Sequence, residues 1–268
     1  MTILGRLTMA LLTVAMLAAG AAKAASTTNF SDQWWIEKES GWGASVLQQA
    51  DILFIDLFVY GADNKPTWFT AAAFLQGNSP AGHVLFTGDL YSTTGPYYGG
   101  TFNPSAVGYA KVGTLTFDAD TVNTARLTYT VSGVPVVKNV TRQFWRNENL
   151  SGTYYGGLID DETCIPASGG GHNEGAATIQ IAHNADNSIR VAVQVPATGD
   201  DVTFNGTYSQ LGHMGQIVAT FSYSTTTVSV TMFEIEKTIS GFTARYVGNS
   251  QSPTESCVTN GRIGGVRR

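Results

Sequence analysis

The stretch ATIQIAHNADNSIRVAVQV at residues 177–195 decides the fold class of this chain. Apolar residues alternate with polar or small ones on both sides of the turn 184–187, which is the pattern of two β-strands joined in a hairpin. The pattern predicts an antiparallel pair with one buried face. The inward side chains would be Ala177, Ile179, Ile181, Ile189, Val191, Val193 and Val195.

Short runs of the same kind fill the rest of the chain and form two series separated by the aperiodic segment 146–149. We expect an N-terminal aromatic-rich domain over residues 29–146 and a C-terminal domain over residues 149–268. The first series begins with a short strand around Trp34 and Trp35 and continues over 42–49, 52–60, 67–75, 84–90, 109–117, 125–131 and 137–145. The second series comprises 150–157, 176–183, 188–195, 202–210, 214–223, 228–236, 241–247 and 261–266.

Consecutive short strands of this number suit closed up-and-down β-barrels, because closure removes the exposed strand edges that invite aggregation. The fold class that we predict is therefore all-β, with two tandem antiparallel barrel-like domains of about eight strands each. Cys164 follows the first strand of the second series and Cys257 precedes the last. A disulfide between them would fix the barrel seam from loops at one end, and it is worth about 4 to 5 kcal/mol in the chain-entropy model.

Residues 1–24 have the pattern of a signal peptide. Arg6 provides a positive start, residues 7–19 are apolar, and Ala22-Lys23-Ala24 is a small-x-small cleavage site. We expect cleavage after Ala24 and a soluble protein in the periplasm or outside the cell. No later stretch reaches the ~20 apolar residues of a spanning helix, so no membrane span is expected.

The charge of the chain excludes one class of partner. Removing residues 1–24 takes away two basic residues and no acidic one, which changes the net charge from −5 to −7. An acidic chain is repelled by nucleic acid and by anionic membrane surfaces. We therefore expect no nucleic-acid partner.

The expected strand 52–60 is apolar on both faces. Leu53, Ile55, Leu57 and Val59 alternate with Phe54, Phe58 and Tyr60, and only Asp56 interrupts the second set. Such a strand is predicted to be covered on both sides or to line a cavity.

Several blocks of the first half resemble a family of secreted bacterial β-rich proteins of uncharacterised activity. The blocks are Trp34-Trp35, Glu39-Ser40-Gly41-Trp42-Gly43 and Pro66-Thr67-Trp68. The second half, from Leu150-Ser151-Gly152 to Gly264-Gly265-Val266, resembles the domain that often follows. The resemblance implies export and β architecture and implies no substrate. Where the family has Gly before Pro66, this chain has Asn64, which also tolerates the left-handed conformation that such a turn needs.

All five tryptophans fall in the first half. Indole rings at the mouth of a small barrel form platforms for sugar rings or flat apolar faces, and large aromatics also fill cores. Nearby acidic, basic and tyrosine side chains would supply hydrogen bonds. The candidate ligand-binding residues are Trp34, Trp35, Glu39, Trp42, Asp56, Trp68, Tyr91 and Arg142.

Three classes of function fit these features. The leading one is non-enzymatic binding of a small apolar or glycan ligand. The second is a protein-binding module, such as an inhibitor of an extracellular enzyme or an envelope assembly factor, with exposed aromatics as anchors. The third is a hydrolase using Glu37 or Glu39, since adjacent carboxylates can raise one pKa for acid catalysis.

No motif predicts a catalytic nucleophile, a cofactor or a metal. Ser40 lacks the Gly-x-Ser-x-Gly pattern of a hydrolase elbow. The four histidines show no short ligand spacing. We therefore expect no cofactor and no metal site.

Overall fold

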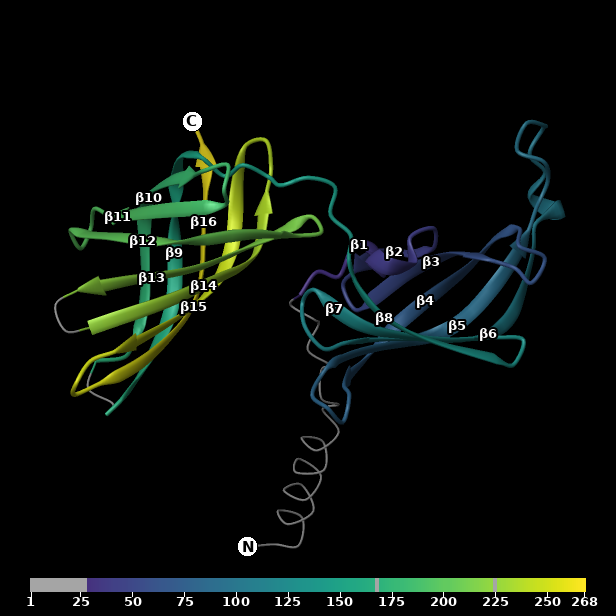
Figure 1. The fold of residues 1–268 in the computed structure, drawn as a ribbon, viewed down its shortest axis with the longest axis horizontal. Helices are drawn as coiled ribbons and strands as arrows, with labels where there is room; N and C mark the ends of the chain where they lie inside the picture. Colours follow the sequence, from purple (N-terminus) through teal and green to yellow (C-terminus); the bar gives the residue numbers. More distant parts are fainter. Residues whose placement is uncertain (1–27, 167–168, 224–225) are drawn as a thin grey trace, which may run out of the picture.

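The computed structural model describes residues 28–166, 169–223 and 226–268, and the predicted signal peptide lies outside these ranges. The chain is all-β and forms two closed antiparallel barrels of eight strands each, as the sequence predicts (Figure 1). Among the described residues, no helix has the length and apolar character that crossing a membrane requires.

The N-terminal barrel, drawn from purple to teal in Figure 1, closes where β1 pairs with β8 at Trp34↔Arg142 and Trp35↔Thr141. Two short 3₁₀ helices, η1 (Glu37–Glu39) and η2 (Pro104–Ala106), interrupt it. Its strands are β1 (Asp32–Trp35), β2 (Gly43–Gln49), β3 (Ile52–Tyr60), β4 (Pro66–Asn78), β5 (Val84–Thr94), β6 (Gly108–Ala119), β7 (Thr124–Val131) and β8 (Val134–Arg142).

The C-terminal barrel, drawn in green and yellow, closes where β9 pairs with β16 along almost their whole length, from Ser256↔Ile165 to Arg267↔Tyr154. Its strands are β9 (Gly152–Ile165), β10 (His172–His183), β11 (Ser188–Val195), β12 (Asp200–Leu211), β13 (Met214–Tyr223), β14 (Thr226–Lys237), β15 (Gly241–Gln251) and β16 (Ser256–Arg267).

The predicted disulfide is present and joins Cys164 to Cys257 across this seam. Its placement differs in one respect from the expectation, because both cysteines lie inside strands and not in loops. Cys164 and Cys257 face each other as a register pair of β9 and β16. The crosslink therefore holds two neighbouring strands together directly.

Several strands of the C-terminal barrel are longer than predicted. β9 runs eight residues further than expected, to Ile165, and β16 begins at Ser256 and not at residue 261. The extra segments carry inward polar residues such as Asp160, Glu162 and Thr259, so the alternation of apolar and polar residues fails there. In the N-terminal barrel the error is reversed, since β8 ends at Arg142 and the predicted strand end at Trp145 is a loop.

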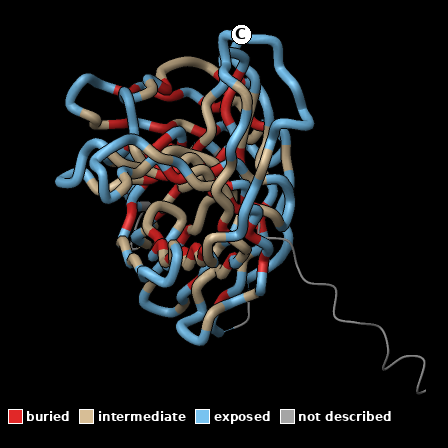
Figure 2. Tube along the Cα trace, turned by 90° about the vertical axis from the view of Figure 1, so that its right-hand side faces the viewer, coloured by how far each residue is buried: buried red, intermediate tan, exposed pale blue. Residues whose placement is uncertain are grey.

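The burial of the predicted inward sets is confirmed. Ala177, Ile179, Ile189, Val191 and the remaining inward residues of the first hairpin are buried, apart from Val195, which is half-buried. Figure 2 shows the buried segments inside the molecule and the exposed ones at loops and hairpin ends. Asn64 adopts the left-handed conformation, with φ 61°, as the turn before Pro66 was expected to require.

The outer face of β3 contradicts the first alternative of the prediction, cover on both sides, although one end of the strand lines a surface hollow. Leu53, Ile55 and Leu57 are fully buried inside the barrel, but the alternate aromatic side chains face outward and are about half exposed. With their neighbours on β2 and β4 they form a surface that we call the outer aromatic face. Its members, 45–62% exposed, are Leu47, Phe54, Phe58, Tyr60, Trp68 and Phe74.

A polar joint connects the two barrels beside the linker 143–151. The carboxylate of Asp32 on β1 accepts hydrogen bonds from the backbone N–H of His213 (2.9 Å) and from Arg142 Nη1 (3.2 Å), and His213 Nδ1 lies 2.8 Å from it. His213 belongs to the turn between β12 and β13 of the other barrel. On the same side, Lys237 pairs with Glu148 of the linker at 3.3 Å.

Candidate functional site

The interior of the N-terminal barrel is filled by aromatic rings. Phe30, Trp34, Phe86 and Phe117 are each at most 1% exposed. Phe30 meets Phe86 and Phe117 edge to face at 5.9 and 5.7 Å, and Trp34 meets Phe117 at 5.0 Å. Such contacts are favourable ring geometries in a packed core.

The interior of the C-terminal barrel is different because most of its inward side chains are smaller. Val, Ala, Ile and Gly dominate the inward positions of β10 and β11, and the C-terminal barrel has a hollow of about 660 Å³ at the end that carries the disulfide. We call this hollow the cup. Its volume lies in the range of ordinary small-molecule pockets, about 300 to 1,000 Å³.

One side of the cup is apolar. Apolar inward residues of β11, β12 and β14 line it, and Leu158 and Ile263 add apolar surface on β9 and β16. An apolar ligand that covered this surface would gain about 25 cal/mol of binding free energy per Å² of apolar area removed from water. The residues of the wall are Val193, Val195, Val202, Phe204, Val230 and Met232.

The opposite side carries an ordered polar row. Asp160 is buried, and its carboxylate accepts hydrogen bonds from the hydroxyl of Tyr246 and from Asn173 Nδ2 (2.9 Å). Two residues further along β9, Glu162 accepts a hydrogen bond from Thr259 Oγ1 (3.2 Å). Because successive inward positions of a strand are two residues apart, both carboxylates face the interior.

Tyr246 is held in its protonated form. Burial raises the pKa of its hydroxyl, and the hydrogen bond to Asp160 together with the negative charge of that carboxylate raises the pKa further. The hydroxyl is therefore a fixed donor that orients Asp160. Gly261 allows this arrangement, since a Cβ there would lie 2.5 Å from Tyr246 Cζ and 2.7 Å from Asp160 Cβ.

The far end of the barrel is closed. Tyr154 and Phe242 meet edge to face at 4.8 Å, and Leu150 covers them from the linker side. The hydroxyl of Tyr154 donates to the carbonyl of Leu150 at 2.7 Å. The cup thus has a floor, and its mouth lies at the disulfide end.

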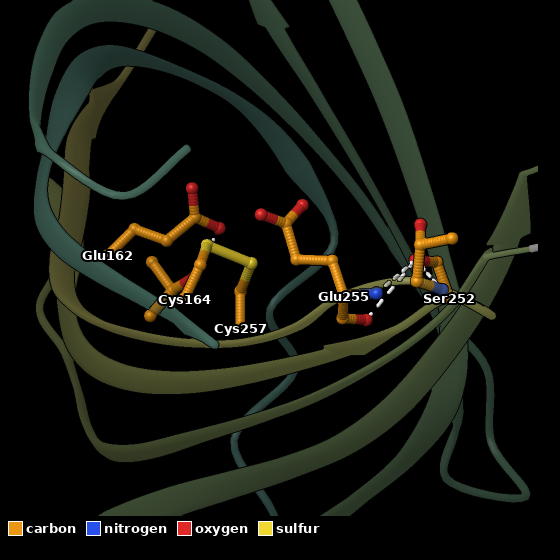
Figure 3. Close-up of a disulfide and its surroundings, with 7 residues drawn as sticks. Glu162, Cys164, Ser252, Glu255 and Cys257 are labelled. Carbon is orange, nitrogen blue, oxygen red and sulfur yellow. Dashed lines mark hydrogen bonds between the residues drawn. A yellow bond between two sulfur atoms is a disulfide. The ribbon is translucent and has the colours of Figure 1, made fainter. Parts of the chain in front are cut away.

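The disulfide is part of the mouth. Figure 3 shows the carboxylates of Glu162 and Glu255 on either side of it, pointing in the same direction. Glu162 lies within 4.8 Å of both sulfur atoms, a geometry compatible with a metal cluster. Because the sulfurs are bonded to each other, they are not the thiolates that a metal would need.

His172 stands at the same rim but turns away from the polar row. Its Nδ1 lies 2.9 Å from Asp161, and its Nε2 lies 4.0 Å from Glu174. The hydrogen bond to Asp161 holds the pKa of His172 above its ordinary value. The positive charge of protonated His172 is therefore paired mainly with the exposed carboxylate of Asp161.

The structure separates the residues that the sequence suggested as a ligand site. Trp34 lies fully buried in the core, where its N–H donates to the carbonyl of Phe30 (3.0 Å). The buried Arg142 stacks on the Trp34 ring at 4.9 Å and donates to the carbonyls of Asn29 (2.6 Å) and Val122 (2.7 Å). Both side chains close one end of the N-terminal barrel.

A second pair from that set forms a small surface cluster. Trp42 Nε1 donates to Glu39 Oε2 (2.9 Å), and the ammonium of Lys138 pairs with the same carboxylate and lies 5.1 Å from the Trp42 ring. The hydrogen bond from Lys138 is the main cause of a lowered pKa of Glu39. A general acid needs the opposite shift, so the geometry does not support the hydrolase hypothesis at Glu39.

The remaining candidates lie on the outside of the N-terminal barrel. Asp56 and Trp68 line a surface hollow of about 460 Å³ together with Phe58 and Tyr60. Tyr91 lies opposite Thr70, which itself faces Asp56, and Trp35 is half-buried on β1. Ligand binding by these residues stays a prediction.

Sequence reasoning missed the polar row of the cup. Asp160, Glu162 and Thr259 lie in polar stretches without periodicity, which read as loops. The signal that could have found them is the disulfide, because pairing Cys164 with Cys257 extends β9 and β16 past these residues and turns every second side chain inward.

Comparison with known proteins adds no assignment. No protein-family model matches the chain, and a search of curated proteins gave no significant match. The family resemblance of the sequence blocks therefore stays an expectation.

Proposed function

We propose that the protein is an exported, non-enzymatic binding protein that takes a small, largely apolar ligand into the cup of its C-terminal barrel. One observation carries this proposal: a hollow of about 660 Å³ with an apolar wall on one side and oriented hydrogen-bonding groups on the other. This combination is typical of small-molecule sites, in which a few polar groups orient a mostly apolar ligand. The disulfide supports export, since such bonds persist in oxidising compartments.

The N-terminal barrel has a different interior. Its lumen is filled by Trp34 and the phenylalanine rings around it. Under this proposal the N-terminal barrel is a structural support, attached to the C-terminal barrel by the contacts of Asp32 with His213.

A neutral fluorescent apolar probe, N-phenyl-1-naphthylamine, tests the proposal on the purified protein after export. We expect saturable binding with about one site per chain. Val202→Trp fills the wall of the cup and should weaken binding at least about tenfold, or about 1.4 kcal/mol. The matched control is Val218→Trp, on the exposed outer surface of the neighbouring strand β13, which should bind as the wild type does.

Two results would contradict the proposal. One is the absence of saturable binding by the wild-type protein to the naphthylamine and to a panel of apolar and glycan ligands. The other is equal binding by the Val202→Trp variant, with its fold verified by circular dichroism.

The outer aromatic face favours a second candidate function, protein binding. Phe58 and Trp68 are a cross-strand pair, each about half exposed, next to a shallow hollow. Exposed aromatic pairs are frequent anchors of protein interfaces. Crosslinking in an envelope extract tests it: a specific adduct that is lost in Trp68→Ser and retained in Val218→Ser would support this candidate, and an unchanged adduct pattern would remove it.

A further inference from the structure

The charge of the cup restricts the chemistry of its ligand. Its inward carboxylates are those of Asp160 and Glu162, and no Lys or Arg belongs to the described lining residues. The nearby Arg245 and Arg262 form a register pair of β15 and β16 whose side chains face outward, where Arg245 pairs with Glu234 at 3.4 Å. His172 pairs with Asp161 at the rim.

The partners of the two innermost carboxylates are neutral. Asp160 receives hydrogen bonds from a phenol and an amide, and Glu162 receives one from a hydroxyl. In the described part of the chain, neither carboxylate has a basic group within ion-pair distance. A carboxylate has about four acceptor positions, so acceptor capacity remains on both.

Removing a carboxylate from water is costly unless a positive charge or a full set of donors replaces the solvent. An apolar ligand that fills the cup would displace water from Asp160 and Glu162 as well as from the wall. A neutral or anionic ligand would leave that cost uncompensated, whereas a ligand with a positive group would offset it. The neutral donors Tyr246 and Asn173 would meanwhile keep the Asp160 carboxylate in place.

We infer that the ligand of the cup is an amphipathic cation, with its apolar body against the wall of β11, β12 and β14 and an ammonium-type group at Asp160 and Glu162. This inference rests on the proposed function, because it assigns the ligand class of the same site. Complementary charge in a cup with low-dielectric walls would also attract such a ligand.

Four octyl compounds that differ only in the head group test the inference: octyltrimethylammonium, octylamine, octanol and octanoate. Each is used to displace N-phenyl-1-naphthylamine from the whole exported protein at low salt and neutral pH. We expect the two cations to displace the naphthylamine at concentrations about tenfold lower than octanol and octanoate, since charge-assisted contacts in partly buried sites are about this strong.

Two variants locate the effect. Glu162→Gln keeps the size and the hydrogen bond of the side chain and should remove most of the preference for cations while octanol displaces as before. Asp161→Asn removes the same charge from the neighbouring residue of β9, whose side chain is exposed and points outward. This variant should keep the preference for cations.

The outcomes separate the inference from the proposed function. Equal displacement by all four compounds, or preference for octanoate, would overturn the inference and leave the proposed function standing. An absence of naphthylamine binding would overturn the proposed function itself. A Glu162-dependent thermal stabilisation by CaCl2 alone, with no preference among the octyl compounds, would overturn the inference in favour of a metal cation.

Discussion

Gly261 shows how one residue of β16 allows the polar row to exist. Its missing side chain leaves the space in which the Tyr246 ring lies against Asp160. Any Cβ at this position would come within 3 Å of both residues, which is closer than carbon atoms approach without displacement. The geometry of the donor to Asp160 therefore depends on this glycine.

We expect Gly261→Ala to lower the free energy of unfolding by about 1 to 3 kcal/mol, the usual cost of forcing extra volume into a packed site. Urea unfolding followed by circular dichroism measures the change. Gly248→Ala, on the adjacent strand, is the control, because its Cβ would meet Thr259 at an ordinary 3.5 Å. Equal stability losses in the two variants would contradict the argument.

For single residues, the sequence did not distinguish inward from outward aromatic side chains. Trp34 and Trp68 both lie in apolar strands, yet one is fully buried and the other is 51% exposed. The difference arises from which face of β1 and of β4 closes toward the lumen, which is a property of the register and not of either residue.

Strands β9 and β16 form the element on which the C-terminal barrel depends. They close it and carry its crosslink, and they present the carboxylates to the cup. The sequence predicts only the apolar parts of these strands, residues 150–157 and 261–266. Over residues 160–163 of β9, Asp160 and Glu162 point inward and Asp161 and Thr163 point outward, so both faces are polar and no periodic signal remains.

Replacing both cysteines by serine should destabilise the C-terminal barrel by about 4 to 5 kcal/mol, because the bond closes a loop of 93 residues in the unfolded chain. In a thermal scan of this variant we expect two separate transitions, first unfolding of the C-terminal barrel and then of the N-terminal barrel. Tryptophan fluorescence reports the second transition, since all five tryptophans precede residue 146. If the substitution lowered the transition temperature seen by tryptophan fluorescence as much as that seen by far-ultraviolet circular dichroism, the effect would not be confined to one barrel.

The molecule as a whole joins two barrels of the same topology that differ in what fills them. Aromatic rings occupy the first, and small aliphatic side chains leave the second hollow. The sequence predicts the number and closure of both barrels from strand spacing. It does not predict the hollow, because the free volume depends on how the inward residues of eight strands meet.

The joint between the barrels should respond to acid. Burial raises the pKa of Asp32, but hydrogen bonds from His213 and Arg142 outweigh this effect and hold the pKa below its ordinary value. A carboxyl with a lowered folded-state pKa stabilises the fold above the ordinary value of about 3.9 and loses that contribution as pH falls through the lowered value.

We therefore expect the free energy of unfolding of the wild type to fall more steeply between about pH 4 and pH 2 than that of Asp32→Asn. At pH 7 the variant should be less stable by about 3 kcal/mol, since it leaves the buried guanidinium of Arg142 without its carboxylate. Parallel pH profiles of the two proteins would contradict this assignment.

The ligand site that we propose lies inside the C-terminal barrel and not at the tryptophans. Titration of the isotope-labelled protein with octyltrimethylammonium, followed by nuclear magnetic resonance, tests this placement because both regions report in one spectrum. We expect the amide signals of Asp160, Glu162, Tyr246 and Thr259 to shift in a saturable manner while the indole N–H signals of all five tryptophans stay unchanged. Shifts at the indoles of Trp42 or Trp68, with the signals of the cup unmoved, would contradict a site inside the C-terminal barrel.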